Sequence, residues 1–510
     1  MTRSDRSAGT ARRLGSQSLI VFAGNLFTLV VGLPLQILVS RVLGADGLGI
    51  YGLIEGAINT ANGFLNAGLA QTAVRFVPEH LERREYGRVR RLIKSSVIIL
   101  LALGAVAYLV TIGLLPFLER QWPQFADRSH VVIVMGLLLP LGLVMFLLQQ
   151  ALRGFQEIRY MILGSSILQL TVKAMVTIAA FAAGLHLIGY VLATVIATAF
   201  GVLWMGYGLL KRVRALPRTG VEEEPAVLRP EWRRFAAISY TTNLLGAATT
   251  YVDRFLLGIF IGADTVGVLL VLRQLQQIPQ VFSQMLLMVG APMFAAAHVR
   301  GDRAEREHLH VLMTDWLMKS SLPLLMFLFM FAAPVLSLFG PQFAEQGVEA
   351  LWVLLLGQAF NLVCGPVGNI ALMSGLESTV LRLSAFNTAL TVILLVGLAP
   401  TLGLLGVAIA GAVTTMTINI AMVLLLRKKL SFRWWNPRFL GWLLPSGASA
   451  AIGIAVLYSG YAHGLIVLSA TLAGMYVVFA AVLFLRGFNE DERDLLHHLK
   501  DRLFAGPARS

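Results

Sequence analysis

Long apolar runs constrain this chain more than any other feature of its sequence. Residues 95–118, SSVIILLALGAVAYLVTIGLLPFL, are one example, and they contain no charged side chain. A helix of about 20 such residues crosses the hydrocarbon core of a bilayer. Hydrophobic residues make up 57% of the chain and charged residues only 13%, whereas soluble domains carry about 25% charged residues. We therefore expect an all-α integral membrane protein.

The apolar runs are numerous enough to predict a topology. We interpret the first run as a retained helix rather than a cleaved signal peptide. We predict fourteen transmembrane helices, with expected ranges 17–40, 49–77, 92–118, 131–152, 160–183, 187–210, 235–260, 265–292, 312–336, 348–374, 380–399, 403–426, 438–461 and 464–485. This even number places both termini on the same side of the membrane. The single cysteine, Cys364, lies in an apolar run, so no disulfide framework is expected.

Lysine and arginine residues orient the predicted helices, because the cytoplasmic loops of membrane proteins carry an excess of them. With a cytoplasmic N-terminus, 33 of the 41 basic residues fall in cytoplasmic segments, and the opposite side holds Arg41, Arg120 and Arg128. We thus expect both termini in the cytoplasm. The same asymmetry accounts for the net charge of +14, so no nucleic-acid partner is predicted.

An internal repeat relates the first six predicted helices to the next six. The triplet Gly-Ala-Asp at 44–46 recurs at 262–264, an offset of 218. The same offset relates further identical residues without a gap: Gly49 and Gly267, Phe76 and Phe294, and His80 and His298. Agreement spread over so many positions indicates a true repeat. Six helices per repeat make both halves enter from one side, an arrangement found in transporters whose substrate path lies between the halves.

The repeat sets the expected domain boundaries. A linker rich in proline and charge follows the sixth helix. We predict an N-lobe with this linker at 1–234, a C-lobe at 235–430, and helices 13 and 14 with a cytoplasmic tail at 431–510.

Polar side chains follow one face of several predicted helices. On the second helix their spacing of i, i+4, i+7 and i+11 places them within about 60° of one another: Glu55, Asn59, Asn62 and Asn66. The repeat offset places a second stripe on the eighth helix: Arg273, Gln277, Gln280 and Gln284. The first and seventh helices carry further polar residues, among them Asn25, Gln36, Asn243 and Arg254. Because polar groups that face lipid are costly, we expect one polar cavity where the halves meet. The alternative is that these residues form hydrogen bonds between helices.

The ionisable residues within the helices predict a cationic cavity. Five are basic and two are acidic: Arg75, Lys173, Arg254, Arg273, Lys319, Glu55 and Asp253. We expect Arg75 and Lys319 to snorkel to the interface, which leaves Lys173, Arg254 and Arg273 for the cavity. Arginine suits phosphate oxygens, and amides suit sugar hydroxyls. We also expect Glu55 and Arg273, at equivalent repeat positions, to form an ion pair at an external gate.

Sequence signatures of catalysis are absent. We find no Gly-rich phosphate loop, no H-E-x-x-H pair and no cluster of histidine or cysteine. We therefore predict no enzyme activity, no cofactor and no metal site. A membrane-embedded enzyme of glycan synthesis, or a scaffold for one, stays as an alternative of a different class.

Three stretches carry a resemblance to a known family. RVLGADGLGIYG (41–52), YVDRFLLGIFIGADTVGVLLVLRQL (251–275) and APMFAAAH (291–298) resemble the polysaccharide-repeat-unit (O-antigen-type) flippases of the MATE-like MOP superfamily. The resemblance implies two six-helix lobes, two trailing helices and alternating access in a bacterial inner membrane. It implies an undecaprenyl-pyrophosphate-linked oligosaccharide as substrate, contacted by Arg254 and Arg273. Membrane lipids, a polysaccharide polymerase and glycosyltransferases are the other partners it suggests.

Two other transport functions stay open. The lipid II branch of the superfamily carries arginines in its first two helices, where this chain has Asn25, Gln36 and Glu55. The drug-antiporter branch has twelve helices and acidic cation sites, and Glu55 would serve as the proton or sodium site of such an antiporter.

Overall fold

The computed structural model describes helices almost throughout. The described residues are 3–66, 68–121, 128–217, 232–233, 235–236, 240, 258, 260–430, 433–460 and 464–486. Among them there is no strand, so the prediction of an all-α protein is confirmed. By its internal contacts the chain divides into two units. Unit 1 comprises Met1–Val271 and Val392–Val407, and unit 2 comprises Leu272–Thr391 and Ala408–Ser510.

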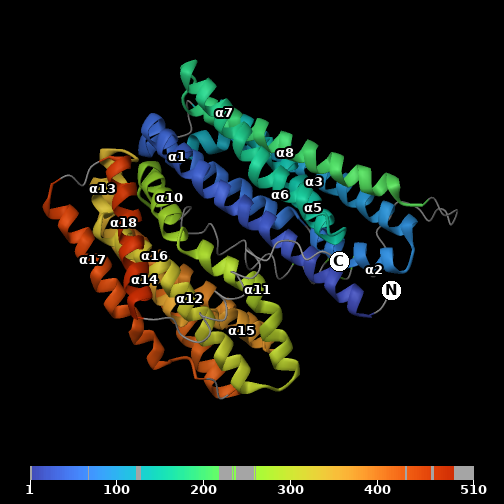
Figure 1. Ribbon diagram of the computed structural model, residues 1–510. Coiled ribbons are helices and arrows are strands. Elements are labelled where there is room, and N and C mark those ends of the chain that lie inside the picture. Colours follow the sequence, from blue (N-terminus) through green and yellow to red (C-terminus); the bar gives the residue numbers. More distant parts are fainter. Residues whose placement is uncertain are drawn as a thin grey trace, which may run out of the picture. The chain divides into compact units, whose positions relative to one another are not determined.

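Unit 1 is a bundle of antiparallel helices. In chain order its elements are α1 (Arg3–Leu65), α2 (Leu69–Glu82), α3 (Tyr86–Gln121), α4 (Ser129–Gly136), α5 (Leu138–Gly154), α6 (Ile158–Ile162), the π-helical turn η2 (Leu163–Leu168), α7 (Gln169–Ala182), α8 (Leu187–Ala215) and the first part of α10 (Ala263–Gln277). Helix α5 packs against α2, α3 and α8, and α8 packs against α7 (Figure 1). The apolar core of this unit includes Leu143 and Leu147 of α5, together with Trp232.

Unit 2 contains the remaining helices. They are α11 (Gln280–Val299), α12 (Arg303–Met330), α13 (Ala332–Ser337), α14 (Pro341–Cys364), α15 (Val367–Met373), α16 (Glu377–Leu430, of which Val392–Val407 belongs to unit 1), the 3-10 turn η3 (Pro437–Trp442), α17 (Leu443–Tyr458) and α18 (Leu465–Arg486). Helix α12 contacts α11, α14, α17 and α18. Two hydrogen bonds join η3 and α18 to it: Trp442 Nε1 donates to Asp315 Oδ1 at 2.8 Å, and the Tyr476 hydroxyl donates to the Ser320 carbonyl at 2.7 Å.

Helix α1 holds two spans joined by a one-residue turn. Thr28 and Asn62 line the same cavity, although a straight helix would separate them by roughly 50 Å at 1.5 Å per residue. The chain folds back at Gly44, whose φ of 66° and ψ of −177° lie outside the helical region. Glycine reaches this conformation because it has no Cβ. The predicted helix 17–40 and the start of the predicted helix 49–77 therefore meet in a tight hairpin. The structure corrects the end of the second prediction, because α1 stops at Leu65 and α2 begins at Leu69 after Gly68, whose φ is 69°.

Helix α16 turns in the same way. Gly403 has φ 59° and ψ −132°, and a Cβ atom added at Gly406 would lie 2.2 Å from the Leu398 carbonyl oxygen. Eight residues of straight helix would separate these positions by about 12 Å. This second hairpin joins the spans predicted at 380–399 and 403–426.

Ten described helical stretches are long and apolar enough to cross a membrane. They include 23–65 and 377–430, each of which contains one of the hairpins. The chain is thus a multi-pass membrane protein. The span predicted at 235–260 lies almost wholly outside the described residues, so the total of fourteen stays a prediction.

The structure corrects the prediction of one continuous helix at 265–292. Helix α10 ends at Gln277 and α11 begins at Gln280. Pro279 lies at the break, where its ring cannot donate the backbone hydrogen bond that a continuous helix needs.

Helices α1 and α10 cross where each contributes two small residues: Ala45 and Gly49 from α1, and Ala263 and Gly267 from α10. A Cβ atom added at Gly49 would lie 1.6 Å from the carbonyl oxygen of Ala263, and one added at Gly267 would lie 2.0 Å from that of Ala45. These four residues all belong to unit 1, and the repeat offset of 218 relates Ala45 to Ala263 and Gly49 to Gly267. The contact is therefore reciprocal. Small residues four apart allow this approach of two membrane helices.

Candidate functional site

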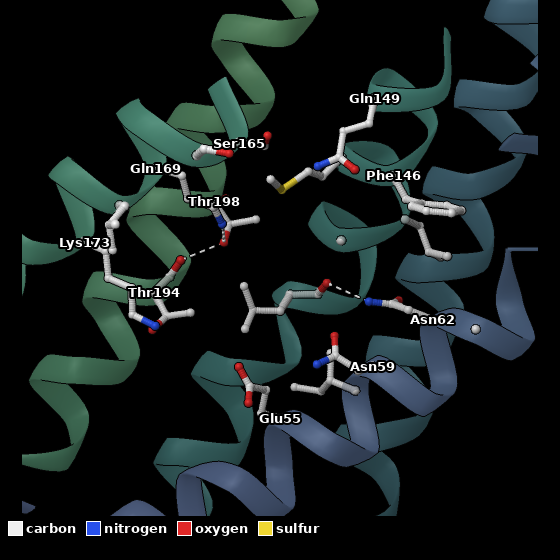
Figure 2. A pocket seen from close by; sticks show the side chains of 18 of the residues that line it. Glu55, Asn59, Asn62, Phe146, Gln149, Ser165, Gln169, Lys173, Thr194 and Thr198 are labelled. Atoms are coloured by element: carbon white, nitrogen blue, oxygen red, sulfur yellow. Dashed lines mark hydrogen bonds between the residues drawn. The ribbon is translucent and has the colours of Figure 1, made fainter. Parts of the chain in front are cut away.

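The helices of unit 1 enclose a polar cavity of about 770 Å³. Figure 2 shows its walls: Glu55, Asn59 and Asn62 point into it from α1, and Gln149, Ser165, Gln169, Lys173, Thr194 and Thr198 point into it from α5, η2, α7 and α8. Its volume lies within the range of about 300–1,000 Å³ that is typical of ligand sites. Polar side chains from five elements thus face one space among otherwise apolar helices.

The stripe predicted on residues 55–66 forms one wall of this cavity. Glu55, Asn59, Asn62 and Asn66 all line it, because helical spacing places them on one face. The Asn62 amide donates to the Leu138 carbonyl at 3.4 Å, and the Asn66 amide donates to Gln71 Oε1 at 3.5 Å. The buried Oδ1 atoms of Asn62 and Asn66 have no hydrogen-bond partner among the described residues. They are therefore free to accept hydrogen bonds from water or a ligand.

A lysine lies at one end of the cavity between two tyrosines. Its ammonium nitrogen, Nζ of Lys173, is 4.4 Å from the ring centroid of Tyr190 and 5.4 Å from that of Tyr51. Aromatic faces attract a cation at such distances. Lys173 Nζ also donates to the Tyr51 hydroxyl at 3.4 Å, and that hydroxyl donates to Glu55 Oε1 at 3.1 Å. One tyrosine therefore connects the cation to the carboxylate.

The opposite wall carries neutral hydrogen-bonding groups. Gln169 Nε2 donates to Thr198 Oγ1 at 3.1 Å, and Gln149, Ser165 and Thr194 lie nearby (Figure 2). None of these was predicted from the sequence, although each is a polar residue within an apolar run. The π-helical turn η2 directs Ser165 and Ser166 into the cavity, and helical periodicity does not reveal such a turn.

The lining residues of this cavity carry balanced charges, whereas the sequence predicts a net positive charge for a cavity where the two halves meet, which stays a prediction. Among the described residues that line the cavity of unit 1, Lys173 carries the positive charge and Glu55 carries the negative charge. Amides and hydroxyls supply the rest of the polar lining. The cavity therefore combines one cation, one carboxylate and many neutral donors and acceptors.

The other predicted site residues lie apart from this cavity or outside the described chain. Asn25 and Gln36 are half-buried on α1 and are not among its lining residues. Asn243 and Arg254 lie outside the described residues. Whether any predicted residue contacts a substrate stays a prediction, as does a cavity between the lobes.

Three predicted residues belong to unit 2. Arg273 Nη1 donates to Gln276 Oε1 at 3.1 Å, Gln277 is exposed, and Gln280 lines a separate cavity of about 200 Å³. Glu55 belongs to unit 1, so its predicted ion pair with Arg273 stays a prediction.

Two membrane cations have partners of their own. Lys319 Nζ lies 2.5 Å from Asp315 Oδ2, and the lysine side chain is only 14% exposed. The snorkelling predicted for Lys319 is therefore wrong, because a carboxylate one helical turn away neutralises it inside unit 2. Arg75 is exposed, with its guanidinium carbon 4.5 Å from the ring centroid of Phe235.

Comparison with protein families gives one match. Residues 14–298 match the model of a family described as polysaccharide biosynthesis protein. This match covers more than half of the chain. No curated protein matches the chain.

Comparison with solved structures finds the same fold in transporters. A multidrug resistance MATE family transporter of the MOP superfamily, in an inward-facing conformation, is 19% identical with a TM-score of 0.64, over 79% of this chain and 94% of that one. A MOP superfamily transporter from Pyrococcus furiosus, described as having a binding pocket of reverse polarity, is 18% identical with a TM-score of 0.59, over 82% and 95% of the two chains. At such identities the likeness shows a shared fold.

Proposed function

The chain belongs to the polysaccharide biosynthesis protein family, and from this premise we propose that it flips an anionic lipid-linked oligosaccharide across a membrane. The substrate is a polyprenyl pyrophosphate that carries a glycan. It moves from the cytoplasmic to the periplasmic leaflet of a bacterial inner membrane by alternating access, with both termini of the protein in the cytoplasm. The product serves the synthesis of a cell-surface polysaccharide.

The amide- and hydroxyl-lined cavity of unit 1 is the observation that carries this proposal. A sugar presents many hydroxyl groups, each of which both donates and accepts hydrogen bonds. Asn62 and Asn66 offer buried acceptor oxygens, and Asn59 and Gln149 add further amides. A hydrocarbon environment strongly disfavours polar groups without partners. A glycan that crosses the membrane needs such a lining along its path.

Lys173 supplies a positive charge for the pyrophosphate. Its ammonium group lies over two tyrosine rings and reaches Glu55 through the Tyr51 hydroxyl. When no ligand is bound, the Glu55 carboxylate balances the charge of Lys173. An incoming phosphate then competes with this carboxylate for the lysine. A bound anion that is not held too firmly can be released on the far side.

Loss of the protein tests this proposal in its host. Deletion of the gene should cause the lipid-linked oligosaccharide to accumulate on the cytoplasmic face of the membrane, and the wild-type gene should restore its export. Unchanged display of the polysaccharide, with no such accumulation, would contradict flipping.

Glu55 favours a second candidate, a cation-coupled antiporter for small molecules. It is a carboxylate on a membrane helix inside a cavity, and such residues often carry protons or ions. In that case deletion would leave the glycan normally exported and raise sensitivity to toxic compounds. The Glu55→Gln variant would then abolish drug efflux and leave glycan export intact.

A further inference from the structure

A second cavity lies wholly within unit 2. It has a volume of about 200 Å³, and residues of α11, α12, α14, α15 and α16 line it. At about 30 Å³ of liquid volume per water molecule, it has room for roughly six waters. The space is small for a whole oligosaccharide and large enough for a single ring.

Amide side chains connect three helices at this cavity. Gln280 Oε1 accepts hydrogen bonds from Gln358 Nε2 at 2.8 Å and from Asn361 Nδ2 at 3.2 Å. Asn361 Oδ1 in turn accepts from Asn419 Nδ2 at 3.0 Å. Gln280 Oε1 thus accepts two hydrogen bonds, and the amide nitrogen of Gln280 is the end of the relay. We name Gln280, Gln358, Asn361 and Asn419 the amide relay.

Three polar groups at the cavity have no partner in the described part of the chain. They are the amide nitrogen of Gln280, the hydroxyl of Ser283 and the side-chain amide of Asn369, and all three residues line the space. Ser283 is only 8% exposed. Polar groups buried among membrane helices need hydrogen bonds. Gln280 and Asn369 are half-buried, so these groups are available to water or to a ligand that enters the cavity.

The lining of this cavity is neutral. Its residues are Gln280, Ser283, Leu287, Leu317, Asn361, Leu362, Gly365, Pro366, Gly368, Asn369, Ile418, Asn419 and Met422. None of these carries a charge, so the cavity offers no counter-ion to a phosphate. Amide and hydroxyl groups beside apolar side chains such as Leu287 and Ile418 suit a sugar ring, which has polar edges and apolar faces.

We propose that the cavity of unit 2 is a second binding site, for one neutral sugar ring. It lies in a different unit from the cavity that holds Lys173, and the proposal rests on the proposed function in that the ring belongs to the glycan being moved. The Gln280 amide, Ser283 and Asn369 bind the ring hydroxyls, and the amide relay holds Gln280 in position.

Cysteine accessibility tests this site in the full-length protein. Because Cys364 is the single cysteine, the Cys364→Ala variant provides a background without thiols. Ser283→Cys then places one thiol in the cavity of unit 2, and Ser165→Cys places one in the cavity of unit 1. A small methanethiosulfonate reagent should label both if both spaces contain water. Failure to label Ser283→Cys in protein that labels at Ser165→Cys would overturn the proposal.

Free sugars then serve as probes, namely N-acetylglucosamine, galactose and rhamnose, with glycerol as the osmotic control. At least one sugar should slow the labelling of Ser283→Cys, by about threefold at twice its Kd. Inorganic phosphate should leave that rate unchanged. Protection by phosphate, or the absence of protection by every sugar, would overturn the neutral sugar site. Sugar protection at Ser165→Cys alone would overturn it and leave the proposed function standing.

A second variant separates binding from packing. Gln358→Leu in the Ser283→Cys background removes a relay donor to Gln280 Oε1 and leaves every residue that lines the cavity in place. Labelling should persist while sugar protection falls, with an unchanged elution profile in detergent. Full protection in this variant would show that the relay does not position the ligand and would overturn its role.

Discussion

The two cavities invite a direct comparison, because equivalent positions of the repeat contribute to both. Asn62 lines the cavity of unit 1, and Gln280, 218 residues later, lines that of unit 2. Both cavities contain several amides, yet only the first has a charged pair among its lining residues, Lys173 and Glu55. Under the proposed function, both cavities would bind hydroxyl groups, and the cavity with Lys173 would also bind an anion.

A pair of histidines shows the same divergence. His80 Nδ1 lies 2.7 Å from Glu85 Oε2, whereas its repeat equivalent, His298, has Nδ1 at 2.8 Å from Arg306 Nη1. Arginine can only donate, so His298 accepts with a deprotonated nitrogen. A carboxylate accepts, so His80 donates. Identical residues at equivalent positions therefore have opposite hydrogen-bonding roles.

Backbone geometry, by contrast, is shared. The crossing of Ala45 and Gly49 with Ala263 and Gly267 is reciprocal. The repeat has thus retained its helix crossing while its polar chemistry diverged.

Removal of the positive charge of Lys173, which distinguishes the two cavities, should have the largest effect on the flipping rate. Lys173→Gln should slow flipping by about 10- to 100-fold, since a hydrogen bond to a charged group contributes about 1.5–3 kcal/mol. Reconstituted vesicles that contain the lipid-linked oligosaccharide would measure the rate. Lys173→Arg should retain part of it, and Lys211→Gln, at an exposed lysine, serves as the control. A wild-type rate in Lys173→Gln would remove the proposed difference between the cavities.

The shared crossing predicts equal effects in both repeats. Gly49→Ala and Gly267→Ala should each destabilise the protein by about 1–3 kcal/mol, because the added Cβ overlaps a carbonyl oxygen. Thermal unfolding in detergent would report both as a lower apparent Tm. Gly206→Ala is the matched control, because a Cβ atom there has nothing within 4 Å. A lower Tm in Gly49→Ala but not in Gly267→Ala would show that the two sides of the crossing are not equivalent.

The amides Asn62 and Gln280 should each contribute less to the flipping rate than Lys173 does, and by similar amounts. Asn62→Leu and Gln280→Leu should each slow flipping by about 2- to 10-fold, since a neutral hydrogen bond contributes about 0.5–1.5 kcal/mol. The two losses should change little with salt, whereas the loss in Lys173→Gln should shrink at high salt. A strong salt dependence in Gln280→Leu would contradict a neutral cavity in unit 2.

The smallest predicted effect concerns Glu85, between the helices α2 and α3. Partial burial acts to raise the pKa of Glu85, but hydrogen bonds from His80 and Arg88 outweigh it and hold that pKa below its ordinary value. The stability that Glu85 contributes is therefore complete above the ordinary carboxyl pKa and is lost as the pH falls through the lowered one.

At neutral pH, Glu85→Gln should accordingly lower the free energy of unfolding by at most about 1 kcal/mol. The apparent Tm should fall with it. The difference from wild type should vanish in acid. Glu79→Gln, which removes a partner of the exposed Arg83, should change the Tm less. A difference in Tm between Glu85→Gln and wild type that grows as the pH falls would contradict this prediction.

The apolar runs and the stripe of residues 55–66 were readable from the sequence, because both follow directly from helical periodicity. The crossing of α1 with α10 could not be read in the same way. The repeat marks Gly49 and Gly267 as equivalent, but it does not say that their helices touch. That contact depends on tertiary packing.

Other features of the structure depend on local backbone geometry, which cannot be predicted from the identity of single residues. The π-helical turn changes which side of α6–α7 faces the cavity, so Ser165 and Ser166 escaped prediction. Asp315 and Lys319 had a readable signal, since their spacing of four favours an ion pair on one helix. The relay of amides around Gln280 joins residues up to 139 positions apart along the chain, and neither periodicity nor the repeat predicts such pairing.

The one-residue turns at Gly44 and Gly403 have a practical consequence for mapping this protein in cells. A chain that reverses within a single glycine presents almost no loop to the aqueous phase. Antibodies and proteases will find little to recognise at these two points, and an inserted epitope would force apart helices that begin immediately on either side. Reporter tags are better placed in the proline- and charge-rich linker that the sequence predicts before residue 235.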